Sequence, residues 1–204
     1  MKRPAWAIVP AKSLVHGKSR LRPVLGDEDR ALFARRLLEH TLDALNACAV
    51  DGVLVAAGDD DVASLAVSRG AYVLRDRGEG SLADVVDRAL ADVESRGAAS
   101  AVVLMADLPL IVADDVAGLF AALVDHDIVL VADHVGHHTN ALGLAPPSAM
   151  PTSFGRADSF AAHLATARAA ALRAAVIESE RIAFDVDTPA DHEQLKTPRR
   201  AAGT

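Results

Sequence analysis

The fold is decided by Val102-Val103-Leu104-Met105-Ala106-Asp107-Leu108-Pro109-Leu110, an apolar run that ends at one carboxylate and is stopped by a proline. The run lacks the apolar and polar alternation of a half-exposed strand, so we expect both faces of this strand to be covered. Strands covered on both faces are typical of a mostly parallel sheet between layers of helices. Because ligands bind at the carboxyl ends of such strands, Asp107 is the first candidate functional residue.

Apolar strands and amphipathic helices alternate along the chain, which predicts an α/β fold with a mostly parallel sheet. The expected strands are Trp6–Val9, Val53–Ala57, Ala71–Leu74, Ala101–Met105 and Ile128–Val131. The expected helices are Asp29–Asn46, Asp60–Arg69, Ser81–Arg96, Asp114–Asp125 and Ser159–Leu172, with Ser159 as N-cap, and a last helix capped by Thr188.

The glycines and prolines of residues 133–151 interrupt this pattern and predict an irregular or antiparallel excursion over the active edge of the sheet. No linker or internal repeat divides the chain. We therefore expect residues 1–196 to form a single domain, followed by a disordered tail at 197–204.

Composition limits the classes of function. With 204 residues and 51% hydrophobic content, the chain can bury one sizeable core. A formal charge of −7 argues against a nucleic-acid-binding surface, and the apolar runs are too short for a membrane-spanning helix or a signal peptide. Cys48 is the one cysteine and falls within a helical pattern, which excludes a disulfide within the chain and favours the cytoplasm. A homodimer is the expected assembly.

The first expected strand runs into a loop that carries three cations, Lys12, Lys18 and Arg20. A loop of this kind can surround phosphates with backbone N–H groups and neutralise their charge. It has neither the Walker A spacing nor the three glycines of a dinucleotide-binding loop. From spacing alone, a solvated basic loop is an equally good interpretation.

A second acidic pair, Asp185 and Asp187, follows the short apolar stretch Ile182–Phe184. Carboxylates at neighbouring strand ends can hold Mg²⁺ together with phosphate oxygens, so these residues and Asp107 are candidate metal ligands. Alternation places Asp185 and Asp187 on the same face, which leaves open which of them is the second ligand. The alternative is that Asp107 only forms a turn and accepts hydrogen bonds from backbone N–H groups.

Polar residues gather again at 137–140. His137 and His138 are adjacent, and no further ligand stands nearby at the spacing of a zinc site. Thr139 and Asn140 are better interpreted as neutral hydrogen-bond donors to a substrate carboxylate or phosphate. A nucleophilic mechanism has little support, because no Gly-x-Ser-x-Gly motif is present and Cys48 is expected within a helix.

Together these segments resemble the guanylyltransferases of coenzyme F-420 biosynthesis, and they occur in the same order. The matching segments are Ile8–Lys12 with Lys18–Leu21, Ala106–Pro109, Thr139–Leu142, Phe154-Gly155 with Ser159-Phe160 and His163, and Asp185–Pro189. The resemblance implies a three-layer, Rossmann-like nucleotidyltransferase fold of the nucleotide-diphospho-sugar transferase type, similar to the molybdenum-cofactor guanylyltransferases. It also implies that GTP is joined to 2-phospho-L-lactate, phosphoenolpyruvate or 3-phospho-D-glycerate with release of pyrophosphate. The product would then pass to a deazaflavin transferase.

For the metal, the resemblance implies that Mg²⁺ is held by Asp107 with one or both of Asp185 and Asp187. The cations of the first loop would hold the leaving pyrophosphate. The attacking phosphate is already anionic, so no protein nucleophile is expected, and catalysis rests on positioning and charge neutralisation.

For the acid, the resemblance implies contacts with Thr139, Gly155 and Ser159. Gly155 and Ser159 are one residue further apart than is usual in the family, so either Ser159 or Asp158 is the counterpart of the family serine. The acid itself is not identified by the sequence, because pocket shape decides it. Two alternatives stay open: a nucleotidyltransferase of the same fold that acts on a molybdopterin or sugar phosphate, and a non-catalytic nucleotide-binding domain.

Overall fold

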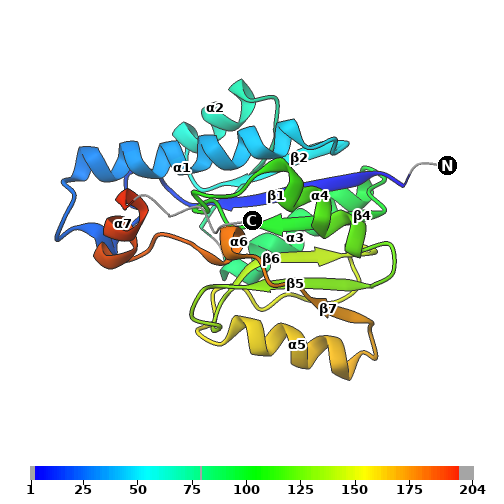
Figure 1. The fold of residues 1–204 in the computed structure, drawn as a ribbon. Helices are drawn as coiled ribbons and strands as arrows, with labels where there is room; N and C mark the ends of the chain where they lie inside the picture. Colours follow the sequence, from blue (N-terminus) through cyan, green and yellow to red (C-terminus); the bar gives the residue numbers. More distant parts are fainter. Residues whose placement is uncertain (1–2, 79, 198–204) are drawn as a thin grey trace.

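The computed structural model describes residues 3–78 and 80–197 and has one mixed sheet between two layers of helices (Figure 1). The seven strands lie in the order β3-β2-β1-β4-β6-β5-β7. Their bounds are β1 (Ala5–Ala11), β2 (Gly52–Ala57), β3 (Tyr72–Arg75), β4 (Ser100–Leu104), β5 (Ile128–Ala132), β6 (Thr139–Leu144) and β7 (Ala174–Val176). The three-layer α/β architecture predicted from the sequence is confirmed. Of the predicted disordered tail, only Thr197 lies within the described residues.

Successive residues of each central strand face opposite sides of the sheet, and each side packs against its own helices. One layer consists of α1 (Asp27–Ala47), α2 (Asp60–Ser68) and α4 (Ala113–Ala122). The other consists of α3 (Leu82–Ser95) and α5 (Ser159–Ala169). Three short helices complete the described part of the chain: η1 (Ser19–Leu21), α6 (Glu180–Ala183) and α7 (Pro189–Lys196). The core on both sides is mainly aliphatic, as expected for a chain that is only 3% aromatic.

The sheet is parallel on one side of β4 and mixed on the other. β3, β2, β1 and β4 pair in parallel, and so do β5 and β7. β6 is antiparallel to both of its neighbours, β4 and β5. The carboxyl ends of β1 and β4 therefore lie at the same edge as the amino end of β6.

The excursion predicted for residues 133–151 is antiparallel as expected, but its position was wrong. Residues 139–144 form β6, which is fully buried and lies inside the sheet rather than over its edge. Gly143 suggested an interruption of regular structure, but it lies within β6. Its lack of a side chain leaves room for Leu123, because a Cβ there would lie 3.0 Å from Cδ1 of Leu123. Thr139 and Asn140, expected in this excursion over the edge, are consequently the first two residues of a central strand.

Several local predictions also need correction. The stretch 182–184 is not a strand, because Ser179 caps a helical turn there and the chain after Phe184 is extended but unpaired. Ser159 is the first residue of α5 and Asp158 occupies the N-cap position. Cys48 follows α1 as its C-cap rather than lying within it. Strand β7 was not predicted, since its three residues are too few for a recognisable pattern.

The predicted start of the last helix is confirmed. The Thr188 hydroxyl accepts a hydrogen bond from the backbone N–H of Asp191, and the Asp191 carboxylate accepts one from the N–H of Thr188. Pro189 occupies the first helical position, where its missing N–H is harmless. This reciprocal cap fixes the chain just after Asp187.

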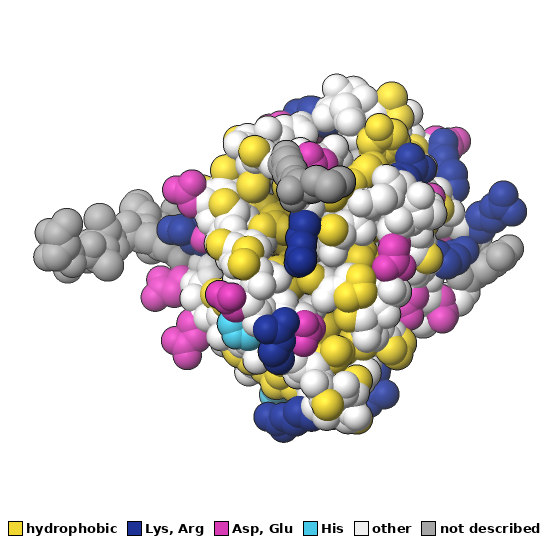
Figure 2. All heavy atoms as spheres, turned by 90° about the vertical axis from the view of Figure 1, so that its right-hand side faces the viewer, with side chains coloured by type: hydrophobic (Ala, Val, Ile, Leu, Met, Phe, Trp, Pro, Cys, Tyr) yellow, Lys and Arg dark blue, Asp and Glu magenta, His cyan; other side chains and the backbone are white. Residues whose placement is uncertain are grey.

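Figure 2 shows the end of the molecule where the parallel strands begin, opposite the edge with Asp107. Basic and acidic side chains are interspersed on this face and do not separate into patches of one sign. Within residues 3–78 and 80–197, every helix is too short or too polar to span a membrane.

Candidate active site

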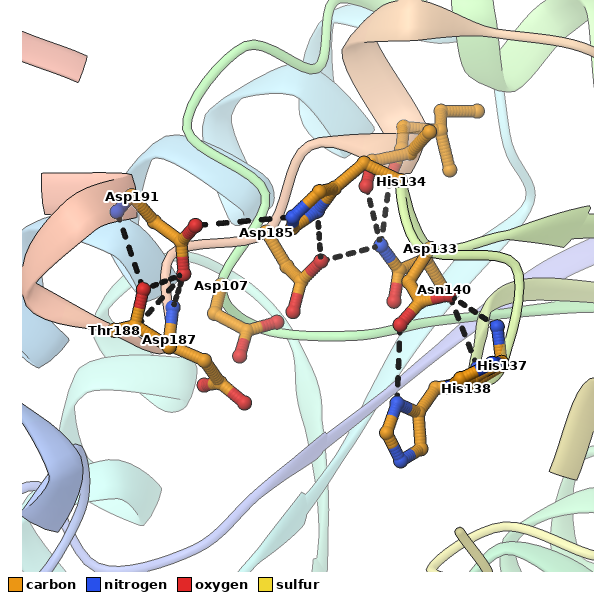
Figure 3. A network of polar contacts seen from close by, with 12 residues as sticks. Asp107, Asp133, His134, His137, His138, Asn140, Asp185, Asp187, Thr188 and Asp191 are labelled. Carbon is orange, nitrogen blue, oxygen red and sulfur yellow. Dashed lines mark hydrogen bonds and ion pairs between the residues drawn. The ribbon is translucent and has the colours of Figure 1, made fainter. Parts of the chain in front are cut away.

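Three carboxylates meet at the edge where β4 ends (Figure 3). Asp107 follows β4, and Asp185 and Asp187 lie on the extended segment between α6 and α7. Each of the three offers an oxygen atom, and these atoms all lie within 4.8 Å of one another. The structure thus brings together all three predicted metal ligands and places both Asp185 and Asp187 beside Asp107.

The segment with Asp185 and Asp187 is held from its opposite side. Phe184 and Val186 are buried in a small apolar cluster with Leu21 of η1. Because side chains alternate along extended backbone, the two aspartates point the other way, toward Asp107. The backbone N–H of Asp187 also donates to the Asp191 carboxylate (3.1 Å). Apolar burial and the cap of α7 together orient the two acidic side chains.

Asn140 holds the start of the same segment. Its buried side-chain Nδ2 lies 2.9 Å from the carbonyl oxygen of Ile182 and 3.2 Å from that of Ala183. The same amide group lies 3.2 Å from Oδ1 of Asp185, to which it donates. The Asn140 amide, predicted to contact substrate, is thus directed at the carboxylate cluster and the turn before it.

Lys18 is the cation of the cluster. Its Nζ lies 2.5 Å from Oδ2 of Asp107 and 2.8 Å from Oδ1 of Asp187. Burial alone would lower the pKa of Lys18, but the two carboxylates outweigh it and raise the pKa, so the ammonium stays charged. The Lys18 backbone is left-handed (φ 51°), and buried Arg30 donates to the carbonyl oxygen of the preceding Gly17 (2.9 Å). Arg30 was not among the predicted site residues; its place near the N-terminus of α1, where a cation is unfavourable, is the one sequence signal that could have drawn attention to it.

The negative charge of the cluster is only partly compensated. Burial and the neighbouring charge of Asp107 raise the pKa of Asp185. Burial also acts to raise the pKa of Asp187, but Lys18, Arg20 and His138 outweigh it and the pKa is lowered. Oδ1 of Asp107 is buried and has no hydrogen-bond partner within the described part of the chain.

These features fit a divalent cation. Three carboxylate oxygens are hard ligands of the kind that Mg²⁺ prefers, and a buried carboxylate oxygen without a partner is costly unless a cation approaches it. Lys18 lies between two of the three carboxylates, and Arg20 contacts Asp187 only from the exposed side (3.5 Å), so the negative charge of the cluster is not fully compensated. The described residues can therefore hold a divalent metal ion with Asp107, Asp185 and Asp187 as ligands.

A cleft leads away from the cluster along the β1 loop. A cavity of about 290 Å³ is lined by Lys12, Lys18, Leu82, Met105 and Asp107, among others. An adjoining hollow of about 380 Å³ shares Lys12 and Leu82 and continues past the glycines 58, 78 and 80. The predicted basic loop thus borders a cleft that ends at the carboxylates. Arg20, the third predicted cation, is largely exposed and lies 3.5 Å from Asp187.

The residues predicted to bind the acid fall into two groups. Thr139 and Ser159 are both buried, and the backbone N–H of Thr139 donates a hydrogen bond to Oγ of Ser159 (3.1 Å). Gly155 lies on the exposed loop before α5 with φ +86°, and a Cβ there would be 3.2 Å from Cβ of Leu82. Asp158, the other candidate for the family serine, is exposed and paired with Arg156. Ser159 is therefore the buried partner of Thr139. Gly155 is not part of this pair and lies against Leu82, which lines the cleft.

His163 links Thr139 to the loop before α5 and is fully buried. Its Nε2 accepts the N–H of Ser153 (2.7 Å), so the ring proton is on Nδ1, which donates to Oγ1 of Thr139 (2.9 Å). Burial lowers the pKa of His163 to about 4. Its ring also packs edge to face against Phe154, at 4.9 Å between centroids.

The buried neutral His163 should make stability depend on pH. A histidine in the unfolded chain has a pKa of about 6.5 and binds a proton that the folded protein excludes until about pH 4. Its contribution is therefore complete above pH 6.5 and lost as the pH falls toward 4. Between pH 7 and 5 we expect a loss of about 2 kcal/mol in the free energy of unfolding from this group, measured by urea titration. His163→Phe should flatten this dependence, whereas exposed His40→Gln should not, and equal slopes for all three proteins would contradict the prediction.

Comparison with known proteins gives the family. The model described as "Guanylyl transferase CofC like" matches residues 5–196. A phosphoenolpyruvate guanylyltransferase of Sphaerobacter thermophilus is 40% identical, with 93% of this chain and 91% of the relative covered. A 2-phospho-L-lactate guanylyltransferase of Methanothermobacter thermautotrophicus is 35% identical (91% and 81% covered). A 3-phospho-D-glycerate guanylyltransferase of Phenylobacterium zucineum is 34% identical (92% and 87% covered).

A solved structure agrees with the fold. A Desulfovibrio desulfuricans protein described as a nucleotide-diphospho-sugar transferase superposes with a TM-score of 0.81 at 18% identity, covering 98% of this chain and 90% of that one. At this identity the likeness concerns the fold alone, and it confirms the predicted Rossmann-like α/β class. Sequence motifs, the edge cluster of carboxylates and the match over residues 5–196 lead to one assignment: this chain belongs to the family of CofC-like guanylyl transferases.

Proposed function

We propose that the protein joins GTP to a small phosphorylated acid, phosphoenolpyruvate being the first candidate, and releases pyrophosphate. The observation that carries the proposal is the carboxylate cluster with Lys18 at the end of a cleft bordered by Lys12. Phosphoenolpyruvate is the first candidate because the relative that is 40% identical over 190 residues is named a phosphoenolpyruvate guanylyltransferase. Mg²⁺ is the metal proposed for the three aspartates.

In the reaction, a phosphate oxygen of the acid attacks the α-phosphorus of GTP. A new P–O–P bridge forms to the acid, and the bond between the α-phosphorus and the bridging oxygen of the β-phosphate breaks. The electron pair of that bond leaves with pyrophosphate. The attacking phosphate is already ionised at neutral pH, so the protein does not have to remove a proton.

Catalysis then requires that the protein bring the GTP triphosphate and the phosphorylated acid together and neutralise their negative charge. Lys12 and Lys18 line the cleft where the triphosphate would lie, and Arg20 adds a cation at its exposed rim. When bound by the three aspartates, Mg²⁺ would supply positive charge at the reacting phosphates. Donors that are already oriented lower the barrier because little reorganisation is needed during the reaction.

The experiment is to incubate the protein with Mg²⁺, one nucleotide and one acid, and to measure pyrophosphate release. Turnover is expected with GTP but not with CTP or UTP, and with phosphoenolpyruvate ahead of 2-phospho-L-lactate and 3-phospho-D-glycerate. Chelation of the metal should abolish it. Turnover only with a molybdopterin or a sugar phosphate, or GTP binding without turnover with any acceptor, would refute the proposal.

The proposal extends to the setting of the reaction. The product would be handed to a transferase that adds it to a deazaflavin acceptor, and the reaction would take place in the cytoplasm. A homodimer remains the predicted assembly, which light scattering of the purified protein would test.

A further inference from the structure

The turn between β5 and β6 carries a histidine that is held by a buried carboxylate. Asp133 is buried, and its Oδ1 accepts the backbone N–H groups of His137 (2.7 Å) and His138 (3.1 Å). Its Oδ2 lies 3.0 Å from Nδ1 of His138. The His138 side chain itself is about half exposed (52%). A buried carboxylate therefore uses both oxygens to fix the turn and the ring of one accessible histidine.

This arrangement determines which edge of the ring is available. An ionised carboxylate only accepts hydrogen bonds, so Nδ1 of His138 carries a proton and donates it to Asp133. The other ring nitrogen, Nε2, has no hydrogen-bond partner among the described residues. When both ring nitrogens carry a proton, the ring can donate Nε2–H to an anion.

His138 faces the carboxylate cluster. In the view of Figure 3, the His138 ring extends from its backbone toward the side on which Asp107, Asp185 and Asp187 lie. Its charge is near enough to act on Asp187: burial would raise the pKa of Asp187, and His138 is one of the cations that together lower it. When protonated, the ring thus adds positive charge near the cluster, in addition to Lys18 and Arg20.

The sheet places His138 on the opposite side of the cluster from the basic loop. Lys12 and Lys18 come from the loop after β1, whereas His138 comes from the turn before β6. In the sheet, β1 and β6 lie on either side of β4, the strand that leads to Asp107. The cleft lined by Lys12 and Lys18 can accept one anionic substrate, and His138 lies on the other side of β4, outside the residues that line this cleft.

We propose that His138 binds the carboxylate of the phosphorylated acid and that Asp133 is its positioning residue. This inference rests on the proposed function. The phosphate of the acid has to face the α-phosphorus of GTP at the metal cluster, so the carboxylate is the anionic group left for a cation in the turn before β6. A charge-assisted hydrogen bond of this kind is among the stronger contacts that a substrate can make.

The test compares His138→Phe and His138→Gln with His137→Gln, the adjacent histidine that meets Asp133 only through its backbone. For His138→Phe we expect the KM for phosphoenolpyruvate to rise about tenfold or more, with the KM for GTP unchanged within about twofold. Gln retains an N–H donor without the charge and should fall between Phe and wild type. His137→Gln should behave as wild type.

Asp133→Asn tests the positioning role. Its amide oxygen can still accept the two backbone N–H groups, but its NH₂ group cannot accept from Nδ1 of His138. We expect a smaller rise in the KM for the acid, and no further rise when Asp133→Asn is combined with His138→Phe, because the two residues act through one contact. A purely structural role would instead lower the melting temperature and leave the ratio of the two KM values unchanged.

Calorimetric binding of phosphoenolpyruvate with Mg²⁺ separates this inference from the proposed function. If wild type turns over and His138→Phe binds the acid equally well, the inference is wrong and the proposed function stands. If wild type binds the acid but does not release pyrophosphate, weaker binding to His138→Phe still supports the inference while the function fails. Absence of acid binding to wild type overturns both.

Discussion

Asp107→Asn is expected to lower the kcat/KM of pyrophosphate release by about a thousandfold while the fold is retained. Asn has the size of Asp but lacks its charge, and its NH₂ group cannot bind a cation. The substitution therefore weakens the metal site at its one buried, unpartnered oxygen and also loosens the contact with Nζ of Lys18. The weaker metal site and the looser Lys18 contact both reduce the positive charge that would stabilise the transition state between the two phosphates.

The measurement is the initial rate of pyrophosphate release over a range of GTP, acid and Mg²⁺ concentrations, from which kcat/KM is obtained. Binding of Mn²⁺, followed by electron paramagnetic resonance, gives a readout that does not depend on turnover. Asp125→Asn, which removes an exposed carboxylate after α4, is the matched control and should behave as wild type. Near-normal turnover of Asp107→Asn would show that Asp107 is not a metal ligand in catalysis.

The carboxylates could be predicted because each is marked by its place in the chain. Asp107 ends a continuous apolar run, and such runs point to the active edge of an α/β sheet. Asp185 and Asp187 alternate with apolar Phe184 and Val186, and this pattern places both acids on one side whether the segment is a strand or extended coil. The open question of which aspartate joins Asp107 could not be settled by spacing, and the structure places both there.

The contacts that orient these groups were beyond the sequence argument, because they join residues that are far apart in the chain. Asn140 reaches the Ile182 carbonyl across a separation of 42 residues, and the position of β6 in the sheet brings them together. Since Gly143 suggested a break, the strand that carries Asn140 was predicted as an excursion. The contact of this amide with Asp185 was therefore not foreseen, and its contact with substrate stays a prediction. His138 was similarly considered only as half of a metal-binding pair, since its tie to Asp133 depends on the shape of the turn.

Lys18→Met is expected to separate the structural role of the ammonium from its role in catalysis. Without a divalent ion, the substitution leaves three carboxylates close together with no ammonium between them. Removal of one partner from a fully buried ion pair costs about 3–5 kcal/mol. The Lys18 side chain is only 10% exposed but that of Asp187 is 42% exposed, so solvent screening reduces the expected loss in the free energy of unfolding to about 2 kcal/mol.

Mg²⁺ should reverse this loss of stability but not the loss of activity. A divalent ion binds the folded protein and stabilises it by mass action, and it should bind more tightly where no ammonium competes for Asp107 and Asp187. The rise in melting temperature on addition of Mg²⁺ should therefore be larger for Lys18→Met than for wild type. Turnover at saturating Mg²⁺ should stay about a hundredfold low, because the triphosphate has lost a cation that the metal does not replace.

The matched control is Lys196→Met, which removes an exposed lysine paired with Glu193 on α7 and should change neither quantity. Thermal denaturation with and without Mg²⁺ gives the first readout, and pyrophosphate release gives the second. Full recovery of both by Mg²⁺ would mean that Lys18 only balances the charge of the metal-free cluster. Recovery of stability alone means that the ammonium leaves the carboxylates for the phosphates when metal and nucleotide are bound, so that one side chain serves the two states in turn.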